Sequence, residues 1–192
     1  MNPSESPRHE LILGGAKSGK SRTAELRAKA WLEAAPGRSA TLIATALPGD
    51  AEMAQRIRRH QVDRAARVPA LETVEAPLEL PGVLRALAQP GHLLVVDCLT
   101  LWLTQCLWPP GAQQPDSTGW PAREAALLAA LRDSASPVVL VSNEISLGGM
   151  PMSREARVCV DTLGLLHQRV AALCARVTLM VAGCEWKVKE AP

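Results

Sequence analysis

A glycine-rich segment, G-G-A-K-S-G-K-S, spans residues 14–21 directly after the apolar run E-L-I-L. Its letters fit the pattern G-x-x-x-x-G-K-[ST], in which backbone N–H groups surround phosphate oxygens. The pattern is informative when a strand precedes it and a helix follows it. The apolar run predicts a strand at 10–14, and the residues that follow predict a helix at 19–34. The segment therefore restricts the chain to folds that place a phosphate-binding loop between a strand and a helix.

Short apolar runs alternate with helical patterns along the rest of the chain, which is typical of a parallel α/β sheet. Further strands are predicted at 40–45, 92–97, 137–142 and 177–182, and helices at 50–60, 80–89, 98–107, 121–134 and 153–175. The final E-W-K-V-K alternates after a turn at Gly183 and predicts an antiparallel edge strand. We predict a single-domain α/β P-loop NTPase fold of RecA-like type, with helices flanking a mostly parallel sheet.

Length and composition favour one folded unit. The chain has 192 residues, of which 47% are apolar, enough to bury a core. The polar residues 1–9 predict a flexible leader, and 10–192 form the predicted domain. Two irregular connections are expected within it, at 64–69 and in the Pro- and Gly-rich segment 108–121.

Composition also argues against several classes of protein. The net charge is only +2, and the chain has no Phe or Tyr, so a nucleic-acid-binding surface is not indicated. The N-terminus lacks the apolar region of a secretory signal, which predicts a cytoplasmic location. Asp97 interrupts the longest apolar stretch, which argues against a membrane span. The five cysteines show no C-x-x-C spacing, as expected of small buried side chains rather than of a metal site.

The predicted phosphate site assigns a role to each residue type. Gly14, Gly15 and Gly19 would let the backbone curl around phosphate oxygens, next to the positive end of a helix dipole. Lys20 would reach the β- and γ-phosphates, and Ser21 would bind Mg²⁺. Asp97, at the end of an apolar strand, is the expected carboxylate for the same Mg²⁺. Two alternatives remain open: a glycine turn without a ligand, and an Asp97 that only caps the next helix.

A histidine after the second strand is a candidate nucleophile. Met53, Ile57 and His60 recur at helical spacing, so the imidazole should point towards protein rather than bulk water. Arg56 and Arg64 lie one turn before and after it, where they would favour neutral imidazole and hold a phosphate. The alternative is a histidine that only packs or is solvated.

Glu144 follows the fourth predicted strand, at the sheet edge where α/β proteins bind ligands. It is a candidate second acid or substrate contact, and a simple helix-leading glutamate is the alternative. The neighbouring S-N-E-I is not an N-K-x-D motif, which argues against a Ras-like GTPase.

Several motifs together resemble one enzyme family. G-G-A-K-S-G-K-S, A-T-A, D-x-E-M-x-x-R-I-x-x-H, T-x-E, V-D-C-L-T-L-W-L, V-S-N-E and V-A-G occur in the order found in bifunctional adenosylcobinamide kinase / adenosylcobinamide-phosphate guanylyltransferases of cobalamin biosynthesis. The resemblance covers about residues 10–189. It implies phosphorylation of a corrinoid, adenosylcobinamide, by ATP or GTP. It then implies transfer of GMP from GTP through a histidine to that phosphate, giving adenosylcobinamide-GDP and pyrophosphate.

The resemblance also implies roles for individual residues. His60 corresponds to the guanylylated histidine, and Lys20 is the second catalytic residue. Ser21 and Asp97 stay the Mg²⁺ ligands predicted from the phosphate site, and the resemblance implies a homo-oligomer, with a trimer as one arrangement. The implied nucleotide contacts are Gly14, Gly15, Ala16, Lys17, Ser18, Gly19, Lys20, Ser21, Thr45, Ala46, Leu47, Arg64, Glu75 and Asp97.

The chain departs from the family pattern at several positions. Lys17 replaces an arginine, the usual H-R-x-x-R-P is H-Q-V-D-R-A, the segment after Asn143 differs, and His167 stands where Asn is usual. These departures lie mainly in the segments assigned to the substrate side and the C-terminal helix. The leading alternative is a monofunctional P-loop small-molecule kinase in which His60 is structural. A nucleotide-binding regulator without turnover is a third interpretation.

Overall fold

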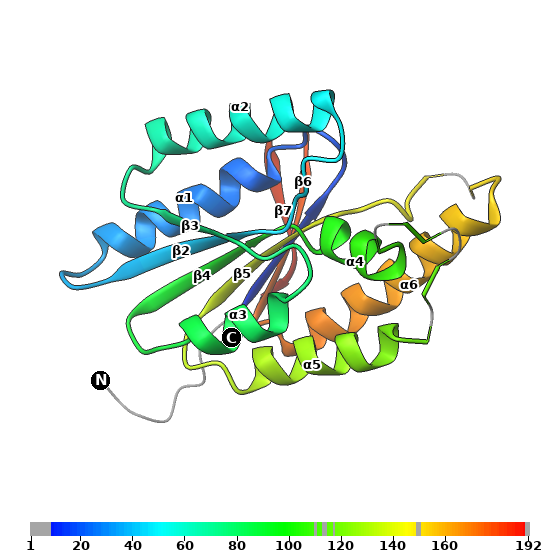
Figure 1. Cartoon of the computed structure of the whole chain (residues 1–192). Helices are drawn as coiled ribbons and strands as arrows, with labels where there is room; N and C mark the ends of the chain where they lie inside the picture. The colour runs from blue at the N-terminus through cyan, green and yellow to red at the C-terminus, as the bar shows by residue number, and fades with distance from the viewer. Residues whose placement is uncertain (1–8, 110, 113–114, 117, 149–150, 191–192) are drawn as a thin grey trace.

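Seven strands and six helices build the fold of the computed structural model, which describes residues 9–109, 111–112, 115–116, 118–148 and 151–190 (Figure 1). The strands are β1 (Glu10–Gly14), β2 (Ser39–Ala44), β3 (Glu72–Glu75), β4 (His92–Asp97), β5 (Val138–Asn143), β6 (Arg176–Val181) and β7 (Cys184–Glu190). The helices are α1 (Lys20–Glu33), α2 (Ala51–Arg67), α3 (Leu80–Leu87), α4 (Leu99–Leu107), α5 (Trp120–Arg132) and α6 (Arg154–Leu173).

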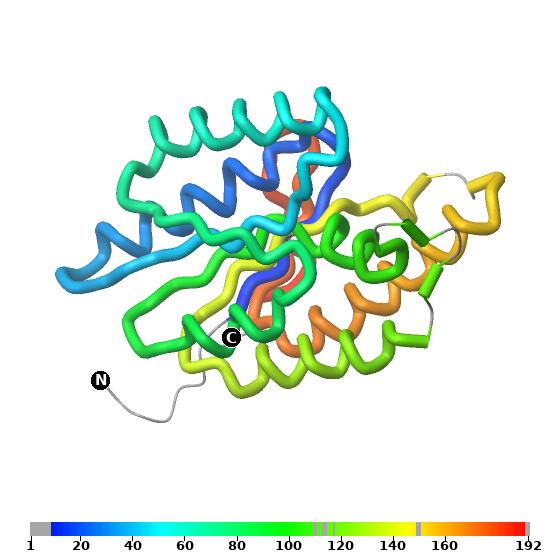
Figure 2. The backbone as a smooth tube through the Cα atoms, in the orientation of Figure 1, coloured from blue at the N-terminus to red at the C-terminus, as the bar shows by residue number. Residues whose placement is uncertain are grey.

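All strands belong to one sheet with the order β3-β2-β4-β5-β1-β6-β7. Every neighbouring pair is parallel except β6 and β7, which are antiparallel. This confirms the predicted α/β class, with a mostly parallel sheet and an antiparallel C-terminal edge. The smooth chain path places β1 inside the sheet, between β5 and β6 (Figure 2). Because parallel strands end at the same edge, the loops after β1, β2, β4 and β5 meet there.

Successive side chains of the inner strands point to opposite faces of the sheet, so each face has its own apolar core. Leu11 packs in one cluster with α3, α4, α5 and α6, whereas its neighbour Ile12 packs in the other cluster with Ala24 and Ala28 of α1. Helices α1 and α2 lie on one side of the sheet, and α3, α5 and α6 lie on the other (Figure 1). The apolar inner strands are therefore buried on both faces, as such runs require.

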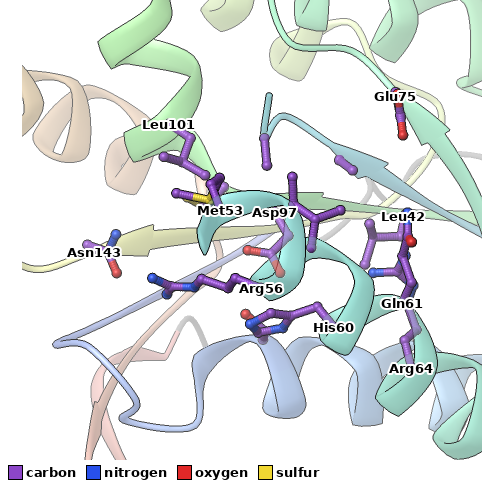
Figure 3. A pocket seen from close by; sticks show the side chains of 15 residues that line it. Leu42, Met53, Arg56, His60, Gln61, Arg64, Glu75, Asp97, Leu101 and Asn143 are labelled. Carbon is purple, nitrogen blue, oxygen red and sulfur yellow. The ribbon is translucent and has the colours of Figure 1, made fainter. Parts of the chain in front are cut away.

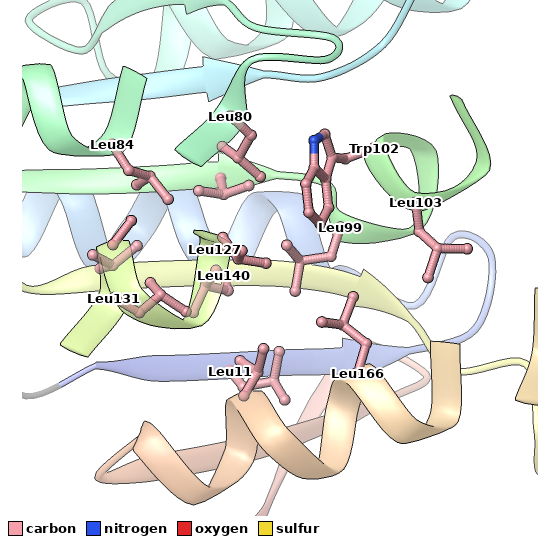
Figure 4. Packing of buried hydrophobic residues seen from close by; sticks show 14 of the residues in the cluster. Leu11, Leu80, Leu84, Leu99, Trp102, Leu103, Leu127, Leu131, Leu140 and Leu166 are labelled. Carbon is pink, nitrogen blue, oxygen red and sulfur yellow. The ribbon is translucent and has the colours of Figure 1, made fainter. Parts of the chain in front are cut away.

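Trp102 of α4 is the largest of the fully buried side chains (Figure 4). Its indole N–H donates to the Leu78 carbonyl at 3.0 Å, and its ring centroid lies 5.4 Å from that of Trp120. This packing joins α4 to the segment before α3 and to the start of α5.

Trp102→Ala is expected to lower the free energy of unfolding by about 3–5 kcal/mol, because it leaves a large cavity and an unpaired carbonyl. Chemical denaturation at equilibrium measures this change. The matched control is Trp186→Ala on β7, where the side chain is 65% exposed. Its expected effect is below about 0.5 kcal/mol. Equal losses in the two variants would contradict the assigned packing.

Three local features differ from the sequence-based expectation. Helix α2 continues to Arg67, although an irregular connection was expected from residue 64, because R-A-A-R favours a helix and Pro69 follows only after its end. The short exposed strand β3 was not predicted, since E-T-V-E pairs only with β2 and buries no side chain. Residues 1–8 lie outside the described residues, but His9 is buried, with its ring bonded to the Leu131 carbonyl and the Val138 N–H.

The five cysteines differ in burial. Three are buried (Cys98, Cys106 and Cys174), Cys159 is half-buried and Cys184 is exposed. The expectation of burial is therefore wrong for Cys184, which lies on the outer strand. Within the described parts of the chain, no helix has both the length and the apolar character needed to cross a membrane.

Candidate active site

The loop between β1 and α1 needs glycine at its first position. Gly14 has φ +154°, and a Cβ there would lie 2.6 Å from the Met180 carbonyl oxygen and 2.7 Å from Ser18 Oγ. Two further residues of the loop have positive φ, Lys17 at 55° and Gly19 at 103°. The loop therefore turns sharply between the strand and the helix and rests against the end of β6.

Gly14→Ala is expected to lower the free energy of unfolding by at least about 2 kcal/mol, because the new methyl group would collide with backbone and the residue would keep an unfavourable φ. Thermal and urea denaturation measure the loss. Gly15→Ala is the matched control, since a Cβ there meets nothing within 4 Å. If the two variants were equally stable, the close approach described here would be wrong.

Lys20 begins helix α1 and folds back over the loop. Its ammonium donates to the Gly15 carbonyl at 2.5 Å and lies 3.5 Å from Ser18 Oγ. Burial lowers the pKa of Lys20, and the nearby Asp97 carboxylate opposes that shift. The first N–H groups of α1 have no partners within the helix, so the loop offers both a lysine and free amides to an anion.

A cavity of about 160 Å³ opens beside α1 at the carboxyl edge of the sheet (Figure 3). Arg56 and His60 of α2 and Asp97 of β4 converge in it. The cavity also brings together six of the predicted site residues, which come from separate parts of the chain: Ser21, Ala46, His60, Arg64, Glu75 and Asp97. A helix that begins in the phosphate loop therefore shares one space with the candidate nucleophile and the candidate carboxylate.

Arg64 is a buried cation in this cavity. Its side chain is on α2, and the residue is only 8% exposed. Burial lowers the pKa of Arg64, while Asp97 opposes the shift. Within the described ranges no salt bridge or hydrogen bond of its guanidinium occurs. The guanidinium is a cation at the cavity wall without a directly bonded anion, so this position suits a negatively charged ligand such as a phosphate.

His60 lines the cavity but remains exposed to solvent. The prediction that its ring points towards protein is confirmed by its place in the cavity lining, but the expected shielding from bulk water is wrong. The reason is that α2 covers the sheet edge loosely: Arg64 is its only buried residue among those of the helix. An exposed imidazole at the cavity wall can receive a group from one ligand and deliver it to another.

The remaining predicted contacts lie around this cavity in different ways. Thr45 is buried, and its hydroxyl donates to the Cys98 carbonyl and accepts from the Cys98 N–H, each at 2.8 Å. It therefore holds the turn between β4 and α4 and does not line the cavity. Leu47 is 38% exposed and also lies outside the lining. Burial raises the pKa of Cys98 to about 12, so this cavity-lining thiol stays neutral at physiological pH.

Among the lining residues that were not predicted as site residues, Gln61 and Asn143 carry amide side chains. The position of Asn143 at the end of β5 is the signal that could have identified it. The N–H of Asn143 donates to Thr100 Oγ1 at 2.8 Å, and that hydroxyl is 3.0 Å from Ser142 Oγ. His167 Nε2 is 2.7 Å from the same Ser142 hydroxyl. This chain of polar contacts fixes the end of β5 beside the cavity.

Glu144 does not line the cavity. Its carboxylate accepts from the Ser146 N–H at 2.6 Å and from the Ser146 hydroxyl. Burial acts to raise the pKa of Glu144, but these hydrogen bonds outweigh it and the net shift is downward. The geometry therefore gives this residue a role in shaping its own turn.

The oxygen donors of Ser21 and Asp97 face the same cavity and suit a hard cation. Within the described residues no group of three or more His, Cys, Asp or Glu side chains could enclose a metal ion. Mg²⁺ is commonly bound by one or two protein oxygens together with substrate phosphates. The donor set therefore fits a cation that arrives with a nucleotide.

Comparison with known proteins agrees with this geometry. The sequence profile of the family described as "Cobinamide kinase / cobinamide phosphate guanyltransferase" matches residues 10–188. The chain is 45% identical over 183 residues to the bifunctional adenosylcobalamin biosynthesis protein CobP of Pseudomonas aeruginosa, covering 95% of this chain and 98% of that protein. It is 36% identical over 189 residues to the bifunctional adenosylcobalamin biosynthesis protein CobU of Escherichia coli, covering 93% and 98%. The Salmonella typhimurium protein of the same name is 35% identical over 187 residues, with the same coverage.

The profile match spans nearly the whole described fold, and all three relatives align along almost their full lengths. The phosphate loop, the histidine on α2 and the carboxylate at the end of β4 all fall inside the matched region. This chain is therefore an enzyme of the cobinamide kinase / cobinamide phosphate guanyltransferase family.

Proposed function

We propose that this chain phosphorylates adenosylcobinamide with ATP or GTP and then transfers GMP from GTP to that phosphate through His60. The observation that supports this best is the shared cavity of Ser21, His60 and Asp97. Phosphoryl transfer needs charge neutralisation at a phosphate loop, and nucleotidyl transfer needs a nucleophile near the α-phosphorus. The cavity lining supplies the histidine, a hydroxyl and a carboxylate, and Ser21 in that lining directly follows Lys20 of the phosphate loop.

In the first step, the main role of the chain is to hold positive charge against the phosphates of the nucleotide. Lys20 and the amides at the start of α1 would hold the β- and γ-phosphates. Ser21 and Asp97 would hold Mg²⁺, which when bound neutralises charge on the transferred phosphoryl group. The hydroxyl of the corrinoid side chain would attack the γ-phosphorus, and the nucleoside diphosphate would leave.

In the second step, a ring nitrogen of His60 would form a bond to the α-phosphorus of GTP. The bond from that phosphorus to the oxygen bridging the β-phosphate breaks, and pyrophosphate leaves. A phosphate oxygen of adenosylcobinamide phosphate then attacks the same phosphorus, and the N–P bond breaks. Arg56 and the buried Arg64 face the cavity, where they can hold the charged phosphates against the ring.

Labelled GTP tests this proposal. The protein is incubated with GTP labelled at either the α- or the γ-phosphate, denatured at alkaline pH and separated from free nucleotide. Retention of the α-label alone, lost on acid treatment, is the expected result, because a phosphoramidate of histidine is stable to base and labile to acid. Corrinoid phosphorylation without any retained label would leave a monofunctional kinase.

Two further properties follow from the same proposal. The family resemblance supports a homo-oligomer whose subunit boundary completes the site, with a trimer as the first arrangement to test. A cytoplasmic location is expected because the nucleotides and the corrinoid substrate would be supplied there.

A further inference from the structure

We infer that the ion pair between Glu25 of α1 and Arg67 of α2 positions His60 for guanylyl transfer. The pair is formed by Arg67 Nη1 and Glu25 Oε2, which contact each other directly. The inference rests on the proposed function and adds to it positioning residues that lie outside the cavity lining. Its basis is the way in which α2 is attached to the rest of the molecule.

Helix α2 has its buried anchors only at its C-terminal end, whereas Met53 and Ile57 in its first half are half-buried and line the cavity. Of its 17 residues only Arg64 is buried, and the middle of the helix lies outside both core clusters. Directly after the helix, Val68 packs into the cluster that contains Ala24 and Ala28 of α1. In the described part of the chain, Glu25–Arg67 is the only ion pair that joins α2 to another element. The orientation of α2 therefore depends on this end.

The partner of Arg67 belongs to the phosphate helix. Glu25 lies on α1, about 1.4 turns after Lys20, and its side chain is only 3% exposed. Such a buried carboxylate needs a countercharge, and Arg67 in the last turn of α2 also suits the negative end of the helix dipole. The pair thus links the helix that carries the nucleophile to the helix that begins at the phosphate loop.

The distance along α2 between Arg67 and His60 is long enough for a small rotation at Arg67 to displace His60. Arg67 follows His60 by seven residues, which is about 10 Å of helix. A rotation of α2 by about 10° around this anchor would move His60 by about 2 Å, from the lever length alone. Nucleophilic attack needs the reacting atoms about 3–3.5 Å apart, and a displacement of about 1 Å can cost about 10²-fold in rate. The first phosphoryl transfer does not use His60 and should not require this alignment.

The test compares the two reactions in four variants. Arg67→Met removes the tether but leaves Glu25 buried without a countercharge, so Glu25→Gln/Arg67→Met is made beside it to remove both charges. Arg67→Lys keeps the charge and loses the planar fork. Arg59→Met is the matched control: it is an arginine on the same helix, its side chain is 84% exposed, and it pairs only with Asp63 of α2.

The maximal rate of label transfer from α-labelled GTP to the protein is expected to fall about 100-fold in the first two variants, with the KM for GTP and the corrinoid phosphorylation rate within about threefold of wild type. Arg67→Lys should recover part of the rate, and Arg59→Met should match wild type. Unchanged label transfer in the double variant would overturn the inference. A parallel loss of both reactions, with lowered thermal stability, would show a purely structural pair and also overturn it. If the wild-type protein itself took up no α-label, the proposed function would fail, and this inference with it.

Discussion

His60→Ala is expected to reduce guanylyl transfer by about 10⁴-fold or more, because removal of a covalent nucleophile removes the reaction path itself. Corrinoid phosphorylation should stay within about threefold of wild type, since its charge-stabilising groups lie on the phosphate loop and β4. The measurement is steady-state formation of adenosylcobinamide phosphate and of adenosylcobinamide-GDP in separate assays. The step that fails should be the second alone.

Gln55→Ala is the control for this variant. Gln55 is an exposed residue of α2 and does not line the cavity, so both activities should be retained. If His60→Ala reduced both activities equally while its unfolding transition stayed at the wild-type position, the separation of roles between His60 and the phosphate loop would be contradicted.

Lys20→Ala is expected to slow corrinoid phosphorylation more than guanylyl transfer, which is the reverse of the effect of His60→Ala. Removal of the ammonium should slow corrinoid phosphorylation by about 10²–10³-fold, because it removes a preorganised charge next to the transferred phosphoryl group. Guanylyl transfer should also weaken, through poorer binding of the same triphosphate. Initial rates over a range of nucleotide concentrations separate the two effects.

The matched control for this second variant is Lys29→Ala. Lys29 is on the same helix, is exposed and pairs only with Glu33 of α1. It should leave both reactions unchanged. Kinase turnover in Lys20→Ala close to that of wild type would show that the phosphate loop does not act as assigned.

The sheet was predictable from the sequence because its inner strands are short, apolar and buried on both faces. β4 and its terminal Asp97 fall at the predicted residues, and the glycine loop lies between its strand and helix as expected. β3 was not predictable on these grounds, since its four residues are exposed and its only partner is β2. An edge strand of this kind depends on tertiary pairing rather than on an apolar pattern.

The candidate site was predictable only in part. Strand ends identify residues such as Asp97, because topology brings them to one edge. The exposure of His60 could not be read from helical spacing, since Met53 and Ile57 on the same face are themselves only half-buried. Similarly, the role of Thr45 in holding the β4–α4 turn arises from contacts with Cys98, 53 residues away in the chain. Such contacts exist only in the folded molecule.

The ion pair that attaches α2 to α1 could not be predicted from the sequence either. Glu25 and Arg67 are far apart in the sequence, and neither has a spacing that marks it as a partner of the other. Their pairing needs both helices on the same side of the sheet, where the fold places α1 and α2 (Figure 1).

Mass spectrometry of the protein after incubation with GTP and Mg²⁺ tests the central claim most directly. Peptides prepared and separated at alkaline pH would locate any added guanylyl group by fragmentation. We predict the group on a ring nitrogen of His60, and its loss when adenosylcobinamide phosphate is added before digestion. A guanylyl group on another residue, or product formation with no modified peptide at any time, would contradict the account.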